Sequence, residues 1–186
     1  MKRPGANNRH IPWSEVAQGP WALFTSGSKS FNIPAFTGAY GFIPEENERD
    51  SYLQTLKGRD GLSSPSVPAL VAHIAAYRDG APWLDALRDY LQANMRYVAD
   101  TLNNAFPALC WQPPEATYLA WIDLRPLNVD DRALQQALIA EQKVAIMPGY
   151  TYGAEGNGFL RLNVGCPREK LERGVEGLIA ALRSLS

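Results

Sequence analysis

The feature that most constrains the fold is an apolar stripe that follows Pro82 and recurs every three or four residues. Its members are Leu84, Leu87, Leu91, Met95, Val98 and Leu102. This spacing places all of them on one face of an α-helix and predicts a single long helix over 81–105. An amphipathic face of this kind usually packs against a core and seldom forms a partner-binding groove, so we expect the chain to fold around this helix.

Helix and strand patterns alternate on both sides of the long helix. Before it, strands are expected at 21–25 and 38–43, then a short helix opened by Pro44 and ended by Gly58, and a helix from Ser64–Pro65 to Gly80. After it, the expected order is strand, helix, strand, strand and helix, near 116–124, 129–141, 143–147, 159–164 and 168–184. The pattern predicts an α/β fold with one domain over 1–80, a connecting helix over 81–105 and a small α/β domain over 106–186.

Composition excludes several classes of function. The formal net charge of −1 provides no basic surface for nucleic acid or for an anionic membrane. No apolar run reaches the length of a membrane span, and the basic residues after Met1 are not followed by the apolar core of a signal peptide. Cys110 and Cys166 do not make a disulfide framework, so a reducing cytoplasm is the expected setting. No cluster has metal-ligand spacing, and His10 and His73 are expected to be structural.

One lysine lies among small hydroxyl residues directly after an apolar run. The segment 25–32 reads Thr-Ser-Gly-Ser-Lys-Ser-Phe-Asn, with Lys29 at its centre. A partly desolvated amine loses its proton more easily and can then attack an aldehyde, while nearby hydroxyl and N–H groups can donate to a phosphate. The segment is not a P-loop, because Ser28 and Leu23 stand where that motif requires glycine. A polar turn with a solvated lysine is the alternative.

A second candidate site lies on the expected strand 159–164. Side chains alternate between the faces of a strand, so Arg161 lies on the face opposite Leu160 and Leu162. A guanidinium held on a strand can bind a carboxylate through two parallel hydrogen bonds. An exposed strand arginine without a ligand is the alternative. The segment 114–124, rich in aromatic and β-branched residues, is expected to be a neighbouring strand.

These segments together resemble the pyridoxal-phosphate enzymes of fold type I, in the class I/II aminotransferase superfamily. The resemblance is greatest to the branch of C–S lyases similar to cystathionine β-lyase. It runs from His10-Ile11-Pro12-Trp13 through the lysine segment 26–32 and Thr117-Tyr118-Leu119-Ala120-Trp121 to 159–163 and the Gly-Cys-Pro-Arg that ends at Arg168. It therefore covers nearly the whole chain in the same order.

The resemblance implies a cofactor, pyridoxal 5′-phosphate, and a role for each candidate residue. Lys29 would hold the cofactor as an imine and act as the catalytic base. Ser26, three positions earlier, would bind the phosphate, with Ser28 a weaker candidate. Arg161 would hold the α-carboxylate of a small amino-acid substrate.

The sequence departs from the family pattern in two respects. Many aminotransferases have an arginine eight positions after the cofactor lysine, where this chain has Thr37, which favours the lyase branch. Family members also have about as much chain again before the position of Met1, and that part carries the aromatic residue that stacks on the cofactor and the aspartate that pairs with its ring nitrogen. The chain is therefore expected to be a C-terminal fragment, with a remnant of the large domain and the complete small domain, and to be inactive in isolation.

Three functions stay open on the sequence. The first is a C–S β-lyase that converts a cysteine conjugate to pyruvate, ammonia and a thiol. The second is an aminotransferase that uses the same lysine, and the third is a non-catalytic orphan fragment. The family resemblance also implies a homodimer for the full-length enzyme, because fold type I active sites lie at a dimer interface.

Overall fold

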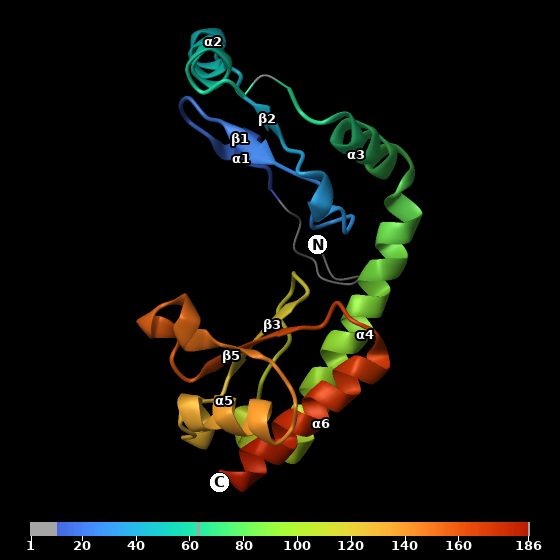
Figure 1. The fold of residues 1–186 in the computed structure, drawn as a ribbon, viewed down its shortest axis with the longest axis vertical. Helices are drawn as coiled ribbons and strands as arrows, with labels where there is room; N and C mark the ends of the chain where they lie inside the picture. The colour runs from blue at the N-terminus through green and yellow to red at the C-terminus, as the bar shows by residue number, and fades with distance from the viewer. Residues whose placement is uncertain (1–10, 63, 186) are drawn as a thin grey trace. The chain divides into compact units, whose positions relative to one another are not determined.

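The computed structural model describes residues 11–62 and 64–185, which divide into two compact units (Figure 1). One unit comprises the described residues up to Ala86, and the other begins at Leu87. His10, where the family resemblance begins, lies outside the described residues. No helix among the described residues is long and apolar enough to span a bilayer.

The C-terminal unit is built on a three-stranded antiparallel sheet. Its strands are β3 (Leu119–Asp123), β4 (Met147–Pro148) and β5 (Phe159–Asn163), in the order β3-β5-β4. The unit also contains most of α4 (Ala81–Ala105), together with α5 (Asp131–Ala140) and α6 (Arg168–Ser184). Short 3₁₀ turns connect these elements at Pro107–Leu109, Arg125–Leu127, Gly149–Tyr152 and Ala154–Gly156.

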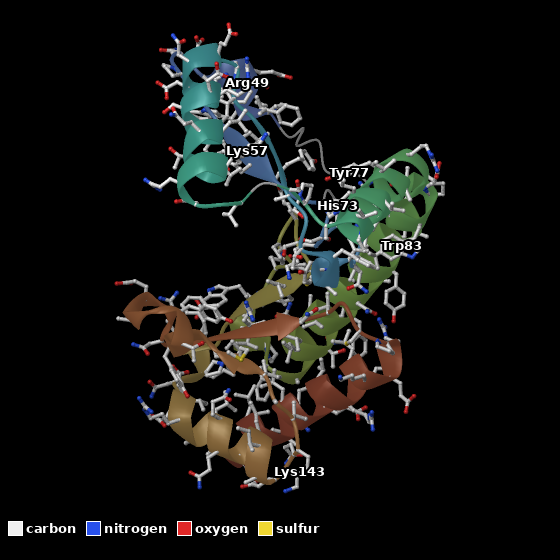
Figure 2. All side chains as sticks on the ribbon, turned by 45° about the horizontal axis from the view of Figure 1, so that its top comes forward. Arg49, Lys57, His73, Tyr77, Trp83 and Lys143 are labelled. Carbon is white, nitrogen blue, oxygen red and sulfur yellow. The ribbon has the colours of Figure 1, made fainter. Side chains whose placement is uncertain are left out.

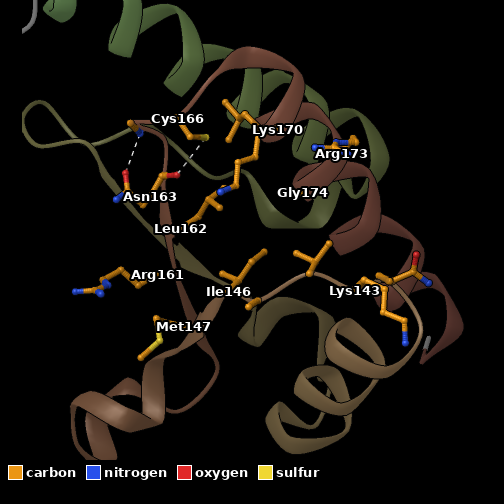
Figure 3. Close-up of a pocket in the computed structure, with 15 residues that line it drawn as sticks. Lys143, Ile146, Met147, Arg161, Leu162, Asn163, Cys166, Lys170, Arg173 and Gly174 are labelled. Atoms are coloured by element: carbon orange, nitrogen blue, oxygen red, sulfur yellow. Dashed lines mark hydrogen bonds between the residues drawn. The ribbon is translucent and has the colours of Figure 1, made fainter.

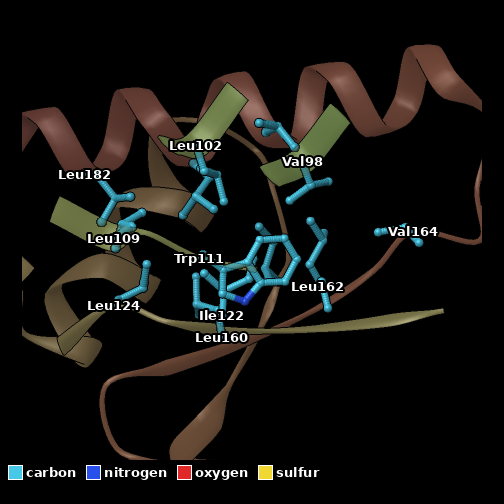
Figure 4. Close-up of a cluster of buried hydrophobic side chains, with 14 of the residues drawn as sticks. Val98, Leu102, Leu109, Trp111, Ile122, Leu124, Leu160, Leu162, Val164 and Leu182 are labelled. Carbon is cyan, nitrogen blue, oxygen red and sulfur yellow. The ribbon is translucent and has the colours of Figure 1, made fainter. Parts of the chain in front are cut away.

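The core of this unit lies between the helices and one face of the sheet (Figure 4). From the α4 stripe, Leu91, Met95, Val98 and Leu102 are buried, whereas Leu84 and Leu87 are half-buried. The sheet contributes alternate residues, including Ala120, Ile122, Leu160 and Leu162, and α6 contributes Leu171, Val175, Leu178 and Leu182. The predicted long helix and its core-facing stripe are therefore confirmed.

All five expected strands are shorter than their sequence pattern suggests. The strands expected over 21–25 and 38–43 are reduced to Leu23–Thr25 and Tyr40–Phe42, and the strand expected over 159–164 ends at Asn163. The strand expected over 143–147 is reduced to Met147–Pro148, so the prediction for residues 143–146 is wrong. Lys143 has a left-handed backbone (φ 56°), and its ammonium donates a 2.6 Å hydrogen bond to Ala140 O at the end of α5. A residue in that conformation cannot belong to a pleated strand, so the strand cannot begin at residue 143. The strand expected over 116–124 likewise begins only at Leu119, after Thr117 at φ 73°.

The N-terminal unit consists of short elements. They are α1 (Trp13–Val16), β1 (Leu23–Thr25), a 3₁₀ turn (Pro34–Phe36), β2 (Tyr40–Phe42), α2 (Glu46–Gln54), a π-helical turn (Thr55–Arg59) and α3 (Val67–Asp79). Strands β1 and β2 pair in antiparallel fashion, with Phe24 opposite Gly41. Gly58 lies inside the π-helical turn, so the prediction that it ends the short helix is wrong. Gly61, at φ 67°, lies just beyond the turn and supplies the left-handed backbone there.

Most large apolar side chains of the N-terminal unit are exposed. In its described residues, Ala69 is the only apolar residue with a buried side chain. An apolar stripe on α3, formed by Val67, Leu70, Val71 and Ile74, faces outward, from Val67 at 70% exposure to Ile74 at 59%. The predicted helix is present and ends before Gly80, but it begins at Val67, with Ser66 capping its first turn, and not at Ser64–Pro65. Its apolar face is not covered by other described residues of this unit.

Candidate cofactor and substrate sites

The segment that carries Lys29 forms a single helical turn directly after β1. Ser26 begins the turn, because its Oγ accepts a 3.1 Å hydrogen bond from the N–H of Ser28. Phe31 N then donates to Gly27 O and Ile33 N to Ser28 O, each at 2.9 Å. Lys29 is exposed on this turn, and its ammonium has no hydrogen bond or ion pair with any described residue. The amine is thus available for reaction, with Ser26 and Ser28 beside it.

The hydroxyl of Ser26 is engaged within the unit. It donates a 2.5 Å hydrogen bond to Gly38 O, in the segment that leads to β2. His73 Nε2, on α3, lies 3.2 Å from the same oxygen. Figure 2 labels His73 and Tyr77 on this helix. His73 was expected to be structural, and no local sequence pattern links it to this site, because His73 and Ser26 are 47 positions apart.

Two glycines allow this close packing. A Cβ on Gly27 would lie 3.2 Å from the rings of Phe31 and Tyr77, and a Cβ on Gly38 would lie 2.8 Å from His73 Cε1. The hydroxyls of Tyr40 and Tyr77 share a 2.7 Å hydrogen bond. Burial, followed by this bond and the Tyr40 charge, raises the pKa of Tyr77 to about 12. The neutral, hydrogen-bonded pair ties β2 to α3.

Arg161 lies at the centre of β5, on the face opposite the core. Its register partners are Trp121 on β3 and Met147 on β4. Leu160 and Leu162 are buried on the other face, as the alternation predicted. The guanidinium of Arg161 stacks over the ring of Tyr152, 4.8 Å from its centroid. It forms no ion pair with a described residue, so it can receive a carboxylate.

Aromatic side chains surround Arg161 on this face of the sheet. Trp121 meets Tyr152 edge-on at 5.6 Å and stacks on Phe159 at 5.5 Å. The guanidinium of Arg125 lies over the ring of Phe159, 4.6 Å from its centroid, and forms a 2.7 Å ion pair with Asp123. This ion pair lowers the pKa of the Asp123 carboxyl, chiefly through the hydrogen bond from Arg125. Arg161 therefore differs from Arg125 in having no carboxylate of its own within the described chain.

A cavity of about 610 Å³ lies between the β4 edge, the end of β5 and the first turns of α6 (Figure 3). Its charged lining residues are Lys143, Arg161, Lys170 and Arg173, without a carboxylate. Figure 3 shows the Arg161 side chain directed away from Lys170 and Arg173. Burial raises the pKa of the Cys166 thiol in this cavity, and the nearby charge of Lys170 partly opposes the shift.

The structure thus brings Lys29, Ser26 and Ser28 together in one turn and adds His73 to them. Arg161 belongs to the other unit, so its role as the residue that holds the substrate carboxylate stays a prediction. Thr37, which replaces the arginine found in many aminotransferases, ends the 3₁₀ turn with φ 38°. Among the described residues, no group of three or more His, Cys, Asp or Glu residues is placed to hold a metal ion.

Known proteins match this chain along nearly its whole length. It is 72% identical to Protein MalY of Escherichia coli over 176 residues, which are 95% of this chain and 45% of MalY. It is 37% identical to cystathionine beta-lyase PatB of Bacillus subtilis, covering 83% of this chain and 40% of PatB. The chain therefore spans less than half the length of these relatives.

Solved structures of pyridoxal-phosphate enzymes also match this chain. The PLP-bound C–S lyase from Staphylococcus hominis superposes with a TM-score of 0.84 at 31% identity, covering 98% of this chain and 47% of that one. Cystalysin from Treponema denticola, solved with pyridoxal 5′-phosphate, superposes over the full chain and 47% of its own length with a TM-score of 0.88 at 27% identity. The family model for aminotransferase class I and II matches residues 2–178. The chain is a member of the class I and II aminotransferase family, with the fold type I architecture of pyridoxal-phosphate enzymes.

Proposed function

We propose that this chain is part of a pyridoxal-phosphate-dependent C–S β-lyase, which cleaves a cysteine conjugate to pyruvate, ammonia and a thiol. The observation that carries the proposal is the Lys29 turn, where an unpaired primary amine projects from a frame of serine hydroxyls. The chemistry of these residues supports the proposal. The cofactor requires an amine that binds its aldehyde and hydroxyls that bind its phosphate. The lyases among the relatives and solved structures favour this reaction class.

The residues present fit the cofactor. A Cβ on Gly27 would lie only 3.2 Å from the Phe31 and Tyr77 rings, so the backbone of the turn packs closely against them and the lysine emerges from a defined position. Lys29 would hold the cofactor covalently, and Ser26 and Ser28 would hold its phosphate. When bound, the cofactor supplies an electron sink for the carbanion at the substrate Cα.

The residues of the chain would divide the remaining work. Arg161 would bind the substrate carboxylate through two parallel hydrogen bonds and so fix the direction of the Cα–H bond. The Lys29 amine, once displaced by the substrate amine, would take the proton from Cα as general base. The Cβ–S bond then breaks with its electron pair on sulfur, which takes up a proton to leave as thiol. Hydrolysis of the three-carbon remainder gives pyruvate and ammonia.

An aminotransferase is the second candidate, because the family includes such enzymes and would use the same lysine and arginine. Product analysis separates the two functions. The reconstituted enzyme should release pyruvate and free thiol from a cysteine conjugate. A keto acid that retains the whole substrate carbon skeleton, without thiol, would contradict the lyase proposal.

We also infer the setting of the enzyme. Both cysteines are free, Cys110 exposed and Cys166 half-buried, which fits a reducing cytoplasm.

The family resemblance supports a homodimer as the active form. Sedimentation of the reconstituted enzyme tests this, and an active monomer would contradict it.

A further inference from the structure

Four polar contacts converge on the side chain of Ser26 and its neighbour His73. Ser26 Oγ donates to Gly38 O at 2.5 Å and accepts from Ser28 N at 3.1 Å. His73 Nε2 approaches the same oxygen at 3.2 Å, and His73 Nδ1 lies 2.8 Å from Ala69 O. These contacts connect α3 to the turn that carries Lys29.

The chemistry of the partners defines the proton positions. A carbonyl oxygen only accepts, so His73 Nδ1 must donate to Ala69 O. In a neutral ring Nε2 then carries no proton and competes with Gly38 O for the single proton of Ser26. In a charged ring Nε2 donates to Ser26 Oγ, whose own proton is then free of that competition. The state of His73 therefore decides which acceptor the Ser26 hydroxyl can serve.

Packing holds the imidazole in this place. Gly38 has no room for a Cβ beside His73 Cε1, at 2.8 Å, and a Cβ on Gly27 would lie 3.4 Å from His73 Cδ2. Ala69, one helical turn before His73, is the buried apolar residue of the unit. The ring is thus enclosed on its sides and directed at one oxygen atom.

We propose that His73 is a positioning residue for cofactor binding, which acts through Ser26. It holds Ser26 Oγ in place, so that the Ser26 proton, which is donated to Gly38 O in this structure, can turn to the cofactor phosphate. Through the bond from Ser28 N to Ser26 Oγ, it also holds the turn from which Lys29 projects. This inference rests on the proposed function, because it takes Ser26 as a ligand of the cofactor phosphate.

The test uses two substitutions that separate the two ring nitrogens. His73→Gln places an amide where Nε2 lies and can keep the contact with Ser26. His73→Asn places an amide where Nδ1 lies and keeps only the contact with Ala69 O. Each is made in the wild-type enzyme and in Ser26→Ala, and the enzyme is purified with its cofactor and then stripped of it.

The probes are pyridoxamine 5′-phosphate and pyridoxamine, neither of which forms a bond with Lys29. The dissociation constant of pyridoxamine divided by that of pyridoxamine 5′-phosphate isolates the phosphate contacts. We expect His73→Asn to reduce this ratio about five- to tenfold, the loss of one hydrogen bond, and His73→Gln to change it less than about twofold. In Ser26→Ala, His73→Asn should have almost no further effect, because its partner is already gone.

Two outcomes would overturn the role of His73. An equal effect of His73→Asn with and without Ser26 would mean that the histidine does not act through that hydroxyl. An unchanged ratio in His73→Asn would mean that it does not act on the phosphate. If the wild-type enzyme prefers neither probe and borohydride labels no lysine of this chain, the proposed function fails, and the role of His73 fails with it.

Discussion

At the scale of single residues, the two proposed reactive groups are held by different means. Lys29 owes its position to the backbone of one helical turn, whereas Arg161 owes its position to a strand and to the ring of Tyr152. Neither forms an ion pair with a described residue. A cation kept free in this way is suited to a ligand that brings its own negative charge or carbonyl group.

Substitution of Arg161 should separate substrate binding from cofactor binding. Arg161→Lys keeps the charge but loses the fork that grips a carboxylate, so we expect kcat/KM to fall about 100-fold. Cofactor affinity should change less than about twofold. Arg125→Lys, on the same face but paired with Asp123, is the matched control and should leave kcat/KM nearly unchanged. Equal effects of the two substitutions would contradict the clamp role of Arg161.

The phenol of Tyr77 gives a pH dependence with a defined sign. Its pKa is raised from 10.0 to about 12 in the folded chain, so the unfolded chain loses this proton first. Stability from this group is complete below pH 10.0 and falls as pH rises through about 12. Tyr40→Phe removes one cause and leaves burial, so ultraviolet titration should find a lower pKa for Tyr77 that is still above its ordinary value. An unchanged titration would contradict the role of the Tyr40 bond.

At the scale of elements, the sheet face around Arg161 acts as a unit. Tyr152 supports the guanidinium, and Trp121 supports Tyr152. Tyr152→Phe keeps the ring and should raise KM less than about twofold, whereas Tyr152→Leu should raise KM about threefold or more at similar kcat. If the two substitutions behaved alike, the ring would have no part in positioning Arg161.

Helix α5 offers an adjacent pair of residues with opposite environments. Leu138 is fully buried, and Ile139 is 58% exposed. Leu138→Ala should lower the free energy of unfolding of the C-terminal unit by about 2–5 kcal/mol, because it leaves a cavity in the core. Ile139→Ala should change it by no more than about 0.5 kcal/mol. Urea unfolding followed by the fluorescence of buried Trp111 measures both, and similar values would contradict the packing described.

Elements with a long regular pattern could be predicted from the sequence, and contacts between distant residues could not. The period of three to four residues predicted α4 and the bounds of α6, and alternation predicted the face of Arg161. The prediction of a strand over 143–146 was wrong. Lys143 takes a left-handed backbone, which the sequence pattern does not reveal. The turn that carries Lys29 could be identified from adjacent residues. Its contact with His73 could not, because that contact depends on how α3 packs on the turn.

At the scale of the whole molecule, the two units differ in how well they cover their apolar residues. The C-terminal unit has a continuous buried core, whereas the N-terminal unit leaves the α3 stripe and the β1–β2 pair exposed. Exposed apolar surface of this extent is a site of association. These residues are therefore expected to be covered in an active enzyme.

A polypeptide limited to residues 1–186 should therefore be catalytically silent and bind pyridoxal phosphate poorly. It would supply the lysine and the serines but not the ring-stacking and nitrogen-binding groups expected from the family resemblance. Pyruvate release from a cysteine conjugate is the assay, with light scattering to detect association through the apolar faces. Turnover on the order of 1 per second or faster would contradict this expectation.

The most direct test of the central claim is borohydride reduction of the cofactor-loaded enzyme, followed by peptide mapping. Reduction fixes the cofactor to the lysine that holds it. The account predicts a single labelled peptide in this chain, with the label on Lys29, and no label in Lys29→Ala. A label on Lys57 or Lys143 with Lys29 unmodified would contradict the account.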